Sequence, residues 1–182
     1  VFEPPPMSSQ LGTIDIDLES VGAEGRYQDW TRDKYTDVVQ LLSDYGALLV
    51  GFDIFFIEPS TNLISESQIR ALERIDAESI DALLARSDYD EMFRRVIADA
   101  GNVYLAQTVV VPDSVRATEP LTEDKVLALQ MIRERSPRLV VDAEASTLAR
   151  GTDFDPPLRS LREAARDFAY AQTVTDIGGA RR

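Results

Sequence analysis

The chain contains no cysteine and no histidine among its 182 residues. Without cysteine it cannot form a disulfide, a thiolate nucleophile or a cysteine-ligated zinc site. Without histidine it has no Ser-His-Asp or Cys-His triad and no imidazole acid–base catalyst. These absences exclude the commonest hydrolase mechanisms, and the lack of thiols also suits an oxidising compartment.

Positive charge and long apolar runs are scarce as well. The 19 Lys and Arg residues face 32 Asp and Glu residues, which gives a net charge of −13. Such a surface repels phosphate backbones and anionic lipid headgroups, so we expect no nucleic-acid partner. The longest apolar run, residues 47–57, is interrupted by Asp53 and is shorter than the roughly 20 apolar residues that span a bilayer. Because the chain begins with Val1 and shows no signal-peptide pattern, we expect a soluble piece of a longer protein.

The apolar residues recur with the periods of strands and helices. Residues 11–17 alternate between apolar and polar, 48–52 are continuously apolar, and 103–111 are rich in β-branched residues, so each range predicts a strand. A helix is predicted over residues 33–45, where apolar residues recur at three- and four-residue steps before Gly46. Two strands joined by a helix normally form a right-handed parallel unit.

The remainder of the chain predicts more helix than strand. Residues 65–99 are expected to be largely helical, with Ser87 or Asp88 as a cap and Gly101 as the stop. The C-terminal elements expected are a helix over 122–134, a short strand over 139–141, a helix from Pro156 to about Asp167, a strand over 168–174, and a turn at 176–179 before a returning strand at 180–182.

These elements predict one α/β domain over residues 1–182. We expect three layers, with a mainly parallel sheet, helices on both of its faces and a C-terminal hairpin. Residues 1–10, which include three consecutive prolines, form an extended lead-in, and residues 112–155 form an irregular, insert-like region.

Acidic residues stand at the ends of the first two predicted strands. Because ligands of parallel sheets bind at the carboxyl ends of the strands, we expect these carboxylates to meet at one edge. An arginine opens the following helix, with a tryptophan beside it. The candidate ligand-binding residues are Asp15, Asp17, Trp30, Arg32, Asp53 and Glu58. No catalytic residue and no cofactor is assigned.

Two other interpretations of this acidic cluster stay open. In the first it is a structural ion-pair network, in which Arg32 neutralises Asp15 or Asp53 and fixes the helix to the sheet. In the second it holds Mg²⁺ or Ca²⁺ and acts as a metal-assisted phosphohydrolase through Asp15, Asp17 and Asp53. The Asp-x-Asp pair is superficially similar to that of haloacid-dehalogenase-like phosphatases, but the residues that follow it and the context of Lys34 do not match that family.

Several ordered motifs carry a more specific resemblance. The motifs are Thr13-Ile14-Asp15-Ile16-Asp17 with Glu19-Ser20, Gly25-Arg26-Tyr27 to Trp30-Thr31-Arg32, Gly51-Phe52-Asp53-Ile54-Phe55-Phe56-Ile57-Glu58-Pro59, Asp90 to Phe93 with Gly101-Asn102-Val103-Tyr104-Leu105-Ala106, and Pro157-Leu158 to Ala165 with Asp176 to Arg182. Together and in this order they resemble the type-2 CHASE domain family, with the third motif the most specific. The family pattern is not followed at residues 27–29, at Gly178 or over 112–155.

The resemblance implies an extracytoplasmic, periplasmic sensor domain, not an enzyme. Its parent would span the membrane and carry a cytoplasmic effector such as an adenylate or guanylate cyclase or a histidine kinase. The stimulus would be a small molecule or a protein, and such effectors usually act in pairs, which makes a homodimer plausible. A rival interpretation from another class is a protein-docking module, whose acidic face would meet a basic partner.

Overall fold

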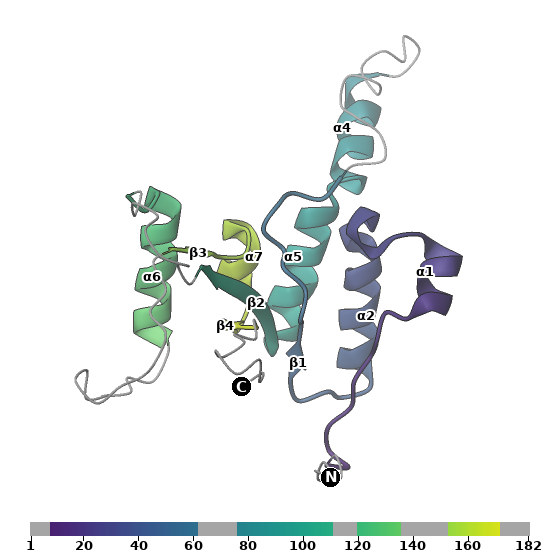
Figure 1. Cartoon of the computed structure of the whole chain (residues 1–182). Coiled ribbons are helices and arrows are strands. Elements are labelled where there is room, and N and C mark those ends of the chain that lie inside the picture. Colours follow the sequence, from purple (N-terminus) through teal and green to yellow (C-terminus); the bar gives the residue numbers. More distant parts are fainter. Residues whose placement is uncertain (1–7, 62–75, 111–119, 136–152, 172–182) are drawn as a thin grey trace, which may run out of the picture. The chain divides into compact units, whose positions relative to one another are not determined.

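The computed structural model describes residues 8–61, 76–110, 120–135 and 153–171 (Figure 1). The chain divides into two compact units, residues 1–30 and 31–182. The expectation of a single sensor domain over the whole chain stays a prediction.

The first unit contains the short helix α1 (Leu18–Glu24) and the 3-10 helix η1 (Tyr27–Asp29). Asp17 caps α1, because its Oδ1 accepts a hydrogen bond from the backbone N–H of Ser20 at 2.8 Å. Gly25 ends the helix with a φ of 82°, a left-handed value that favours glycine. None of the described residues of this unit is buried.

The predicted strand over residues 11–17 is wrong. These residues form no strand, and Ile14 is 68% exposed, so the apolar side of the alternation packs against no core. Asp17 acts as a helix cap, and Asp residues are among the most favoured residues at that position.

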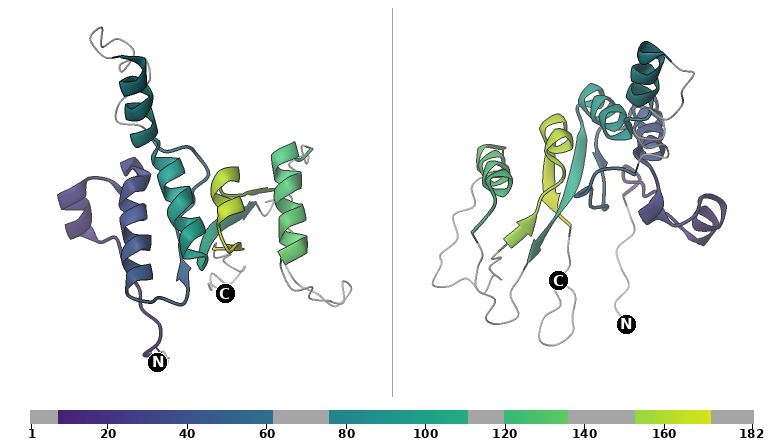
Figure 2. Two further views of the ribbon diagram at one scale, coloured as in Figure 1. Left: turned by 180° about the vertical axis from the view of Figure 1, so that it is seen from behind. Right: turned by 90° about the horizontal axis from the view of Figure 1, so that it is seen from above.

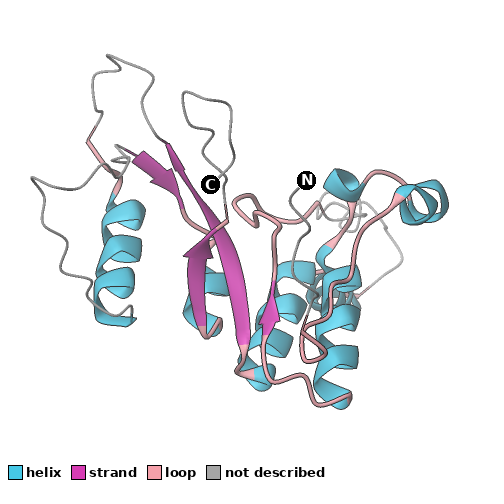
Figure 3. Cartoon of the chain, turned by 60° about the horizontal axis from the view of Figure 1, so that its bottom comes forward, coloured by secondary structure: helices cyan, strands magenta, loops and turns pink. Residues whose placement is uncertain are grey.

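The second unit contains the sheet, whose central strand is β2 (Val103–Val110) (Figure 3). Strands β1 (Val50–Gly51) and β4 (Asp167–Tyr170) both pair with β2 in parallel. Strand β3 (Asp153–Asp155) pairs antiparallel with the last residues of β2.

The α/β class is confirmed, and the described sheet is mixed. The expectation of a mainly parallel sheet in three layers is not confirmed. Residues 11–17 contribute no parallel strand to the described sheet, and the unpredicted strand β3 runs against β2.

Five described helices belong to the second unit: α2 (Arg32–Asp44), α4 (Ala77–Arg86), α5 (Tyr89–Ala100), α6 (Glu123–Arg135) and α7 (Arg159–Ala164). Helix α2 packs beside α5, and α5 packs beside α7 (Figures 1 and 2). Helix α5 begins where the Asp88 Oδ1 accepts from the N–H of Glu91 at 3.0 Å, and it ends at Gly101, whose φ is 67°.

Most of the helix predictions for this unit are confirmed. The helix predicted over 33–45 is α2, and the helix predicted over 122–134 is α6. The helical prediction for 65–99 is confirmed by α4 and α5, although residues 65–75 lie outside the described residues. The helix expected from Pro156 is shorter than predicted, because α7 spans only Arg159–Ala164.

The strand predictions are confirmed only in part. Strand β2 lies where the strand over 103–111 was expected, and β1 and β4 cover parts of the ranges 48–52 and 168–174. The short strand expected at 139–141 and the C-terminal hairpin at 176–182 lie outside the described residues.

The core of this unit lies where α2, α5, α7 and β2 meet. Its members are apolar side chains that are no more than 1% exposed: Val39, Phe56, Phe93, Ile97, Val103, Leu105, Ala106 and Leu161. The loop that follows β1 contributes Phe56 to this core, and its backbone carbonyl accepts from the N–H of Leu158 at 2.8 Å. The core therefore holds the loop as well as the regular elements.

Candidate functional site

The loop of residues 52–60 carries the most specific of the sequence motifs, and aromatic packing fixes its centre. Phe52 and Phe56 form a cluster with Tyr35 of α2 and Phe93 of α5. The ring centroids of Phe56 and Phe93 lie 5.1 Å apart at an interplanar angle of 69°. Such edge-to-face pairs add about 0.5–1.5 kcal/mol beyond the burial of their area.

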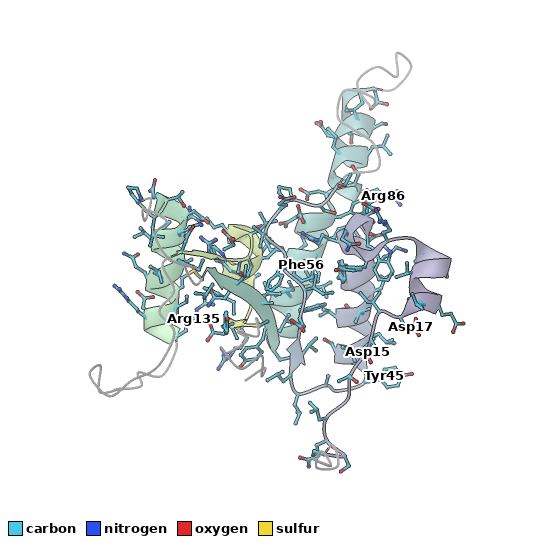
Figure 4. The ribbon with its side chains drawn as sticks, viewed as in Figure 1. Asp15, Asp17, Tyr45, Phe56, Arg86 and Arg135 are labelled. Carbon is cyan, nitrogen blue, oxygen red and sulfur yellow. The ribbon has the colours of Figure 1, made fainter. Side chains whose placement is uncertain are left out.

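Alternate side chains of this loop have opposite surroundings. Phe56 is fully buried and lies in the interior of the second unit (Figure 4), whereas its neighbours Phe55 and Ile57 are 42% and 36% exposed. The side chains of Asp53 and Glu58 are also exposed. The loop therefore presents two carboxylates and two apolar side chains to solvent from a fixed backbone.

Arg32, the first residue of α2, lies against the inner side of this loop. Its guanidinium carbon lies 4.6 Å from the centroid of the Phe56 ring, and its Nη2 donates to the backbone carbonyl of Glu58 at 2.7 Å. Its Nε lies 3.3 Å from the Oδ1 of Asp90, the second residue of α5. Arg32 thus joins α2, the loop and α5.

The backbone of the loop's last described residues is held by the same groups. The Ser60 N–H donates to the Oδ2 of Asp90 at 2.8 Å, and the Ser60 hydroxyl accepts from the N–H of Arg32 at 3.2 Å. We call Arg32, Phe56, Glu58, Ser60 and Asp90 the Arg32 network. Asp90 stands in the first turn of α5, where the helix dipole also stabilises a carboxylate.

Burial sets the electrostatics of the network. The Arg32 side chain is 11% exposed and that of Asp90 is 22% exposed. Burial lowers the pKa of Arg32 from its ordinary value, and the charge of Asp90 opposes this shift. An arginine stays protonated under all ordinary conditions, so the network contains a permanent, largely desolvated cation.

The sequence-predicted residues of the first unit have different surroundings. Asp15 is exposed, and Asp17 serves as the cap of α1 (Figure 4). Hydrogen bonds from the backbone and the hydroxyl of Ser20 lower the pKa of Asp17 from its ordinary value. The Trp30 indole N–H donates to the backbone carbonyls of Glu24 and Gly25, at 3.0 Å in each case.

Within the second unit, Arg32 forms an ion pair with Asp90 and not with Asp53. Of the three candidates in the second unit, the structure brings together Arg32 and the backbone of Glu58. Sequence reasoning missed Asp90 and Ser60, although Asp90 opens one of the motifs that carry the family resemblance.

A second charged network joins α6, α7 and β3. Arg162 is fully buried and donates from Nη1 and Nη2 to the two carboxylate oxygens of Asp124, at 2.8 and 2.5 Å. The Nζ of Lys125 lies 2.8 Å from Asp153 and 3.0 Å from Asp155, on the two sides of Phe154 in β3. Within the described residues, Lys125 supplies the cation that this pair of carboxylates requires.

An open hollow of about 770 Å³ lies near the start of β2 and β4. Its lining residues are Gly101, Tyr104, Arg135, Ala164, Ala165, Arg166 and Asp167. Arg135, at the end of α6 (Figure 4), directs its Nη1 to the backbone carbonyls of Arg162 and Ala165, at 3.4 and 3.3 Å. This arginine therefore caps the last turn of α7, which gives it a structural role.

The described residues provide no candidate metal-binding site. Within residues 8–61, 76–110, 120–135 and 153–171, no three His, Cys, Asp or Glu side chains are grouped so that they could hold a metal ion. The same part of the chain contains no helix long and apolar enough to cross a membrane.

Fold and contacts together define a mixed α/β domain in which a largely buried arginine holds the loop over residues 52–60 between two helices. The model of the CHASE2 domain family matches residues 3–182, and the chain belongs to this family. CHASE2 domains are extracytoplasmic sensory domains. No curated protein and no solved structure matches the chain.

Proposed function

We propose that this chain is the periplasmic signal-input domain of a membrane-anchored bacterial signalling protein, such as an adenylate or guanylate cyclase or a sensor kinase. The observation that carries the proposal is the match to the CHASE2 domain family over residues 3–182. The family is sensory, so the chemistry of the parent belongs to a separate effector.

The residues proposed to take part in sensing are Asp15, Asp17 and Trp30 in the first unit and Arg32, Asp53 and Glu58 in the second unit. In the second unit, the exposed carboxylates of Asp53 and Glu58 stand on a loop whose backbone the Arg32 network holds in place. With a net charge of −13, the domain favours a cationic or neutral stimulus over an anionic one.

The signal would be a shift between two conformations of the domain. A stimulus changes their ratio only through its different affinities for the two conformations. A coupling free energy of about 1–3 kcal/mol is typical for such systems. Pairing of two chains, which cyclases and kinases commonly require, is part of this proposal, and analytical ultracentrifugation of the domain tests it.

The first experiment is a thermal-shift screen of the domain against amines, amino acids, sugars, divalent cations and organic acids. A ligand present at roughly 100 times its dissociation constant stabilises the native state by about 2.7 kcal/mol, which is a readily measured rise in melting temperature. We expect at least one cationic or neutral compound to stabilise the domain, and the variant Asp53→Asn to respond less. A response to no compound of any class would contradict a soluble small-molecule stimulus.

The membrane-anchored parent is tested by the coding sequence on both sides of this chain. We expect an apolar segment of roughly 20 residues before it, further such segments after it, and an effector domain beyond them. A reading frame without apolar segments would overturn the periplasmic location.

A further inference from the structure

The hollow near the start of β2 and β4 has an unusual charge for this protein. Two of its lining residues are arginines, Arg135 and Arg166, and only one, Asp167, is acidic. The whole chain has the opposite balance, with 32 acidic and 19 basic residues. The positive charge of the hollow is therefore a local feature.

The two arginines lack carboxylate partners within the part of the chain that the structure describes. In that part, the arginines that form ion pairs are Arg32, Arg94, Arg95, Arg159 and Arg162. An exposed arginine such as Arg133 also has no such partner there, but it does not line the hollow. Arg135 and Arg166 line the same hollow, where two like charges repel each other and an anion between them would remove the repulsion.

Both arginines retain hydrogen-bond donors for a ligand. A guanidinium has five N–H donors, and the described contacts of Arg135 use only Nη1, which lies 3.4 and 3.3 Å from the carbonyls of Arg162 and Ala165. No described residue accepts a hydrogen bond from the exposed side chain of Arg166. The backbone N–H of Arg166 donates to the Val103 carbonyl at 2.9 Å. The hollow thus offers unused donors on a backbone that is held beside β2.

The helix ends that reach the hollow oppose an anion only weakly. Free carbonyls in the last turn of a helix carry partial negative charge, and α5 and α7 both end at this hollow. Arg135 already donates to two carbonyls at the end of α7, and the Ile97 carbonyl of α5 accepts from the Gly101 N–H at 3.1 Å. The carboxylate of Asp167 is also engaged, because its Oδ1 accepts from the N–H of Phe168 at 2.9 Å.

The size of the hollow suits a small organic molecule. Its volume of about 770 Å³ lies within the roughly 300–1,000 Å³ of typical small-molecule sites. Besides the charged residues, small residues and one aromatic residue line it: Gly101, Ala164, Ala165 and Tyr104. Such a lining leaves room for a carbon skeleton, while the fork of each guanidinium matches the two oxygens of a carboxylate.

We propose that this hollow is a binding site for a small organic dicarboxylate of about the size of succinate. Arg135 and Arg166 bind the two carboxylates, and Tyr104 contacts the carbon skeleton. The site includes neither Asp53 nor Glu58, and the proposed function assigns it no role. The inference therefore goes beyond the proposed sensory function and is tested separately from it.

The net charge of −13 does not exclude an anion at this place. At physiological ionic strength, charges more than about 8 Å apart are largely screened from each other, so the nearest groups determine the potential inside the hollow. Here they are two arginines and one aspartate. We therefore expect binding of the dicarboxylate to weaken as the salt concentration rises.

Isothermal titration calorimetry of the whole chain with succinate tests the proposal. Succinamide is the matched control ligand, because it has the same carbon skeleton and no charge. Sodium sulfate at the same ionic strength is the control for a general effect of anions. We expect heat of binding with succinate only. In NMR spectra, succinate should shift the amide signals of Gly101, Tyr104 and Asp167 but not that of Val39, which lies in the core.

The variant Arg166→Gln removes one of the two cations. It should weaken succinate binding about tenfold or more, which is the loss typical of a charge-assisted hydrogen bond. Because the Arg166 side chain is exposed, we expect the variant to fold as the unchanged protein does. The matched control Arg133→Gln removes the same charge from an exposed arginine outside the hollow and should leave binding unchanged. Asp53→Asn should leave it unchanged as well.

Three results would overturn the proposal. They are no binding of succinate, equal binding of sulfate or succinamide, and an equal loss of affinity in Arg166→Gln and Arg133→Gln. The last result would show that only the overall charge of the protein matters. A screen in which no cationic or neutral compound stabilises the domain would count against the proposed function alone, whereas the absence of succinate binding would count against this site alone.

Discussion

Two arginines of the second unit carry buried charge, and their surroundings differ in kind. Arg162 is 0% exposed and forms two hydrogen bonds with the carboxylate of Asp124, besides donating to the carbonyl of Pro157 at 3.0 Å. Arg32 has one carboxylate contact at 3.3 Å, and it divides its other contacts between a loop carbonyl and an aromatic face.

The difference separates a bidentate ion pair from a set of single contacts. The bidentate geometry of Arg162 satisfies both oxygens of its partner and joins two helices, α6 and α7. The contacts of Arg32 are single and spread over three segments, one of which is an irregular loop. The Arg162 guanidinium is therefore held mainly by one carboxylate, whereas that of Arg32 is held by single contacts to several groups.

The largest expected effect tests the ion pair by which Arg162 joins α7 to α6. Asp124→Ala leaves the fully buried Arg162 guanidinium without its carboxylate, and we expect the free energy of unfolding to fall by about 3 kcal/mol. Urea denaturation of the variant measures this loss. The control Glu123→Ala removes an exposed carboxylate from the same helix turn and should change stability by less than about 0.5 kcal/mol. Equal losses in both variants would contradict the assignment of Arg162 as a joint.

The next effect isolates the aromatic contact of Arg32. Phe56→Leu and Phe93→Leu each shrink a fully buried ring of the same cluster, but a guanidinium lies over Phe56. We expect Phe56→Leu to cost about 1 kcal/mol more than Phe93→Leu, since a desolvated cation–π contact is lost only in the first variant. Paired thermal and urea denaturation of the two variants gives the difference, and a difference near zero would show that Phe56 acts through packing alone.

A smaller effect is expected at Lys125. Lys125→Met leaves the carboxylates of Asp153 and Asp155 without their shared cation, and both are partly exposed. We expect a loss of about 1 kcal/mol at low salt, which decreases at high salt because screening weakens both the lost attraction and the remaining repulsion. The pKa of Asp153, which a hydrogen bond from Lys125 now holds below its ordinary value, should rise in the variant. Carboxylate titration by NMR measures that change, and an unaltered pKa would exclude the contact.

The smallest effect concerns Glu91, the residue that follows Asp90 in α5. Hydrogen bonds from Arg94 and Arg95 lower its pKa to about 2. Because the folded pKa lies below the ordinary value of 4.5, the pair stabilises the fold above that value and the stabilisation is lost as the pH falls towards 2. Glu91→Gln should be slightly less stable than the unchanged protein near neutral pH and equal to it at acidic pH. A difference that does not vary with pH would contradict this origin.

Local patterns in the sequence were sufficient for the helices of the second unit. Apolar spacing and Gly46 define α2, and Asp88 with Gly101 defines α5, because caps and periodicity act within a few residues of the chain. The same kind of local chemistry explains the error at residues 11–17. Alternation favoured a strand there, but it contains no information on whether a partner strand lies alongside, and the capping of α1 by Asp17 prevailed.

The candidate site depended on contacts that local patterns do not specify. Arg32 was identified because a basic residue follows the first acidic segment, whereas its partner stands 58 positions later in the sequence, on another helix. Strand β3 was missed since Asp-Phe-Asp is too short and too polar to differ from a loop in sequence. Long-range pairing, not residue type, decided both cases.

The shortness of β1 affects how readily the sheet edge can pair with strands of other chains. Among the described strands β1 lies at one end of the order, and it is only two residues long, although Leu48 and Leu49 before it are 95% and 60% exposed. A long apolar edge would offer its unpaired backbone groups as a template for strands of other chains. The chain leaves the sheet after Gly51, and the Phe56 side chain lies in the core. The edge of β1 that another strand could pair with is therefore only two residues long. The loop after Gly51 thus limits the length of the strand edge that β1 exposes.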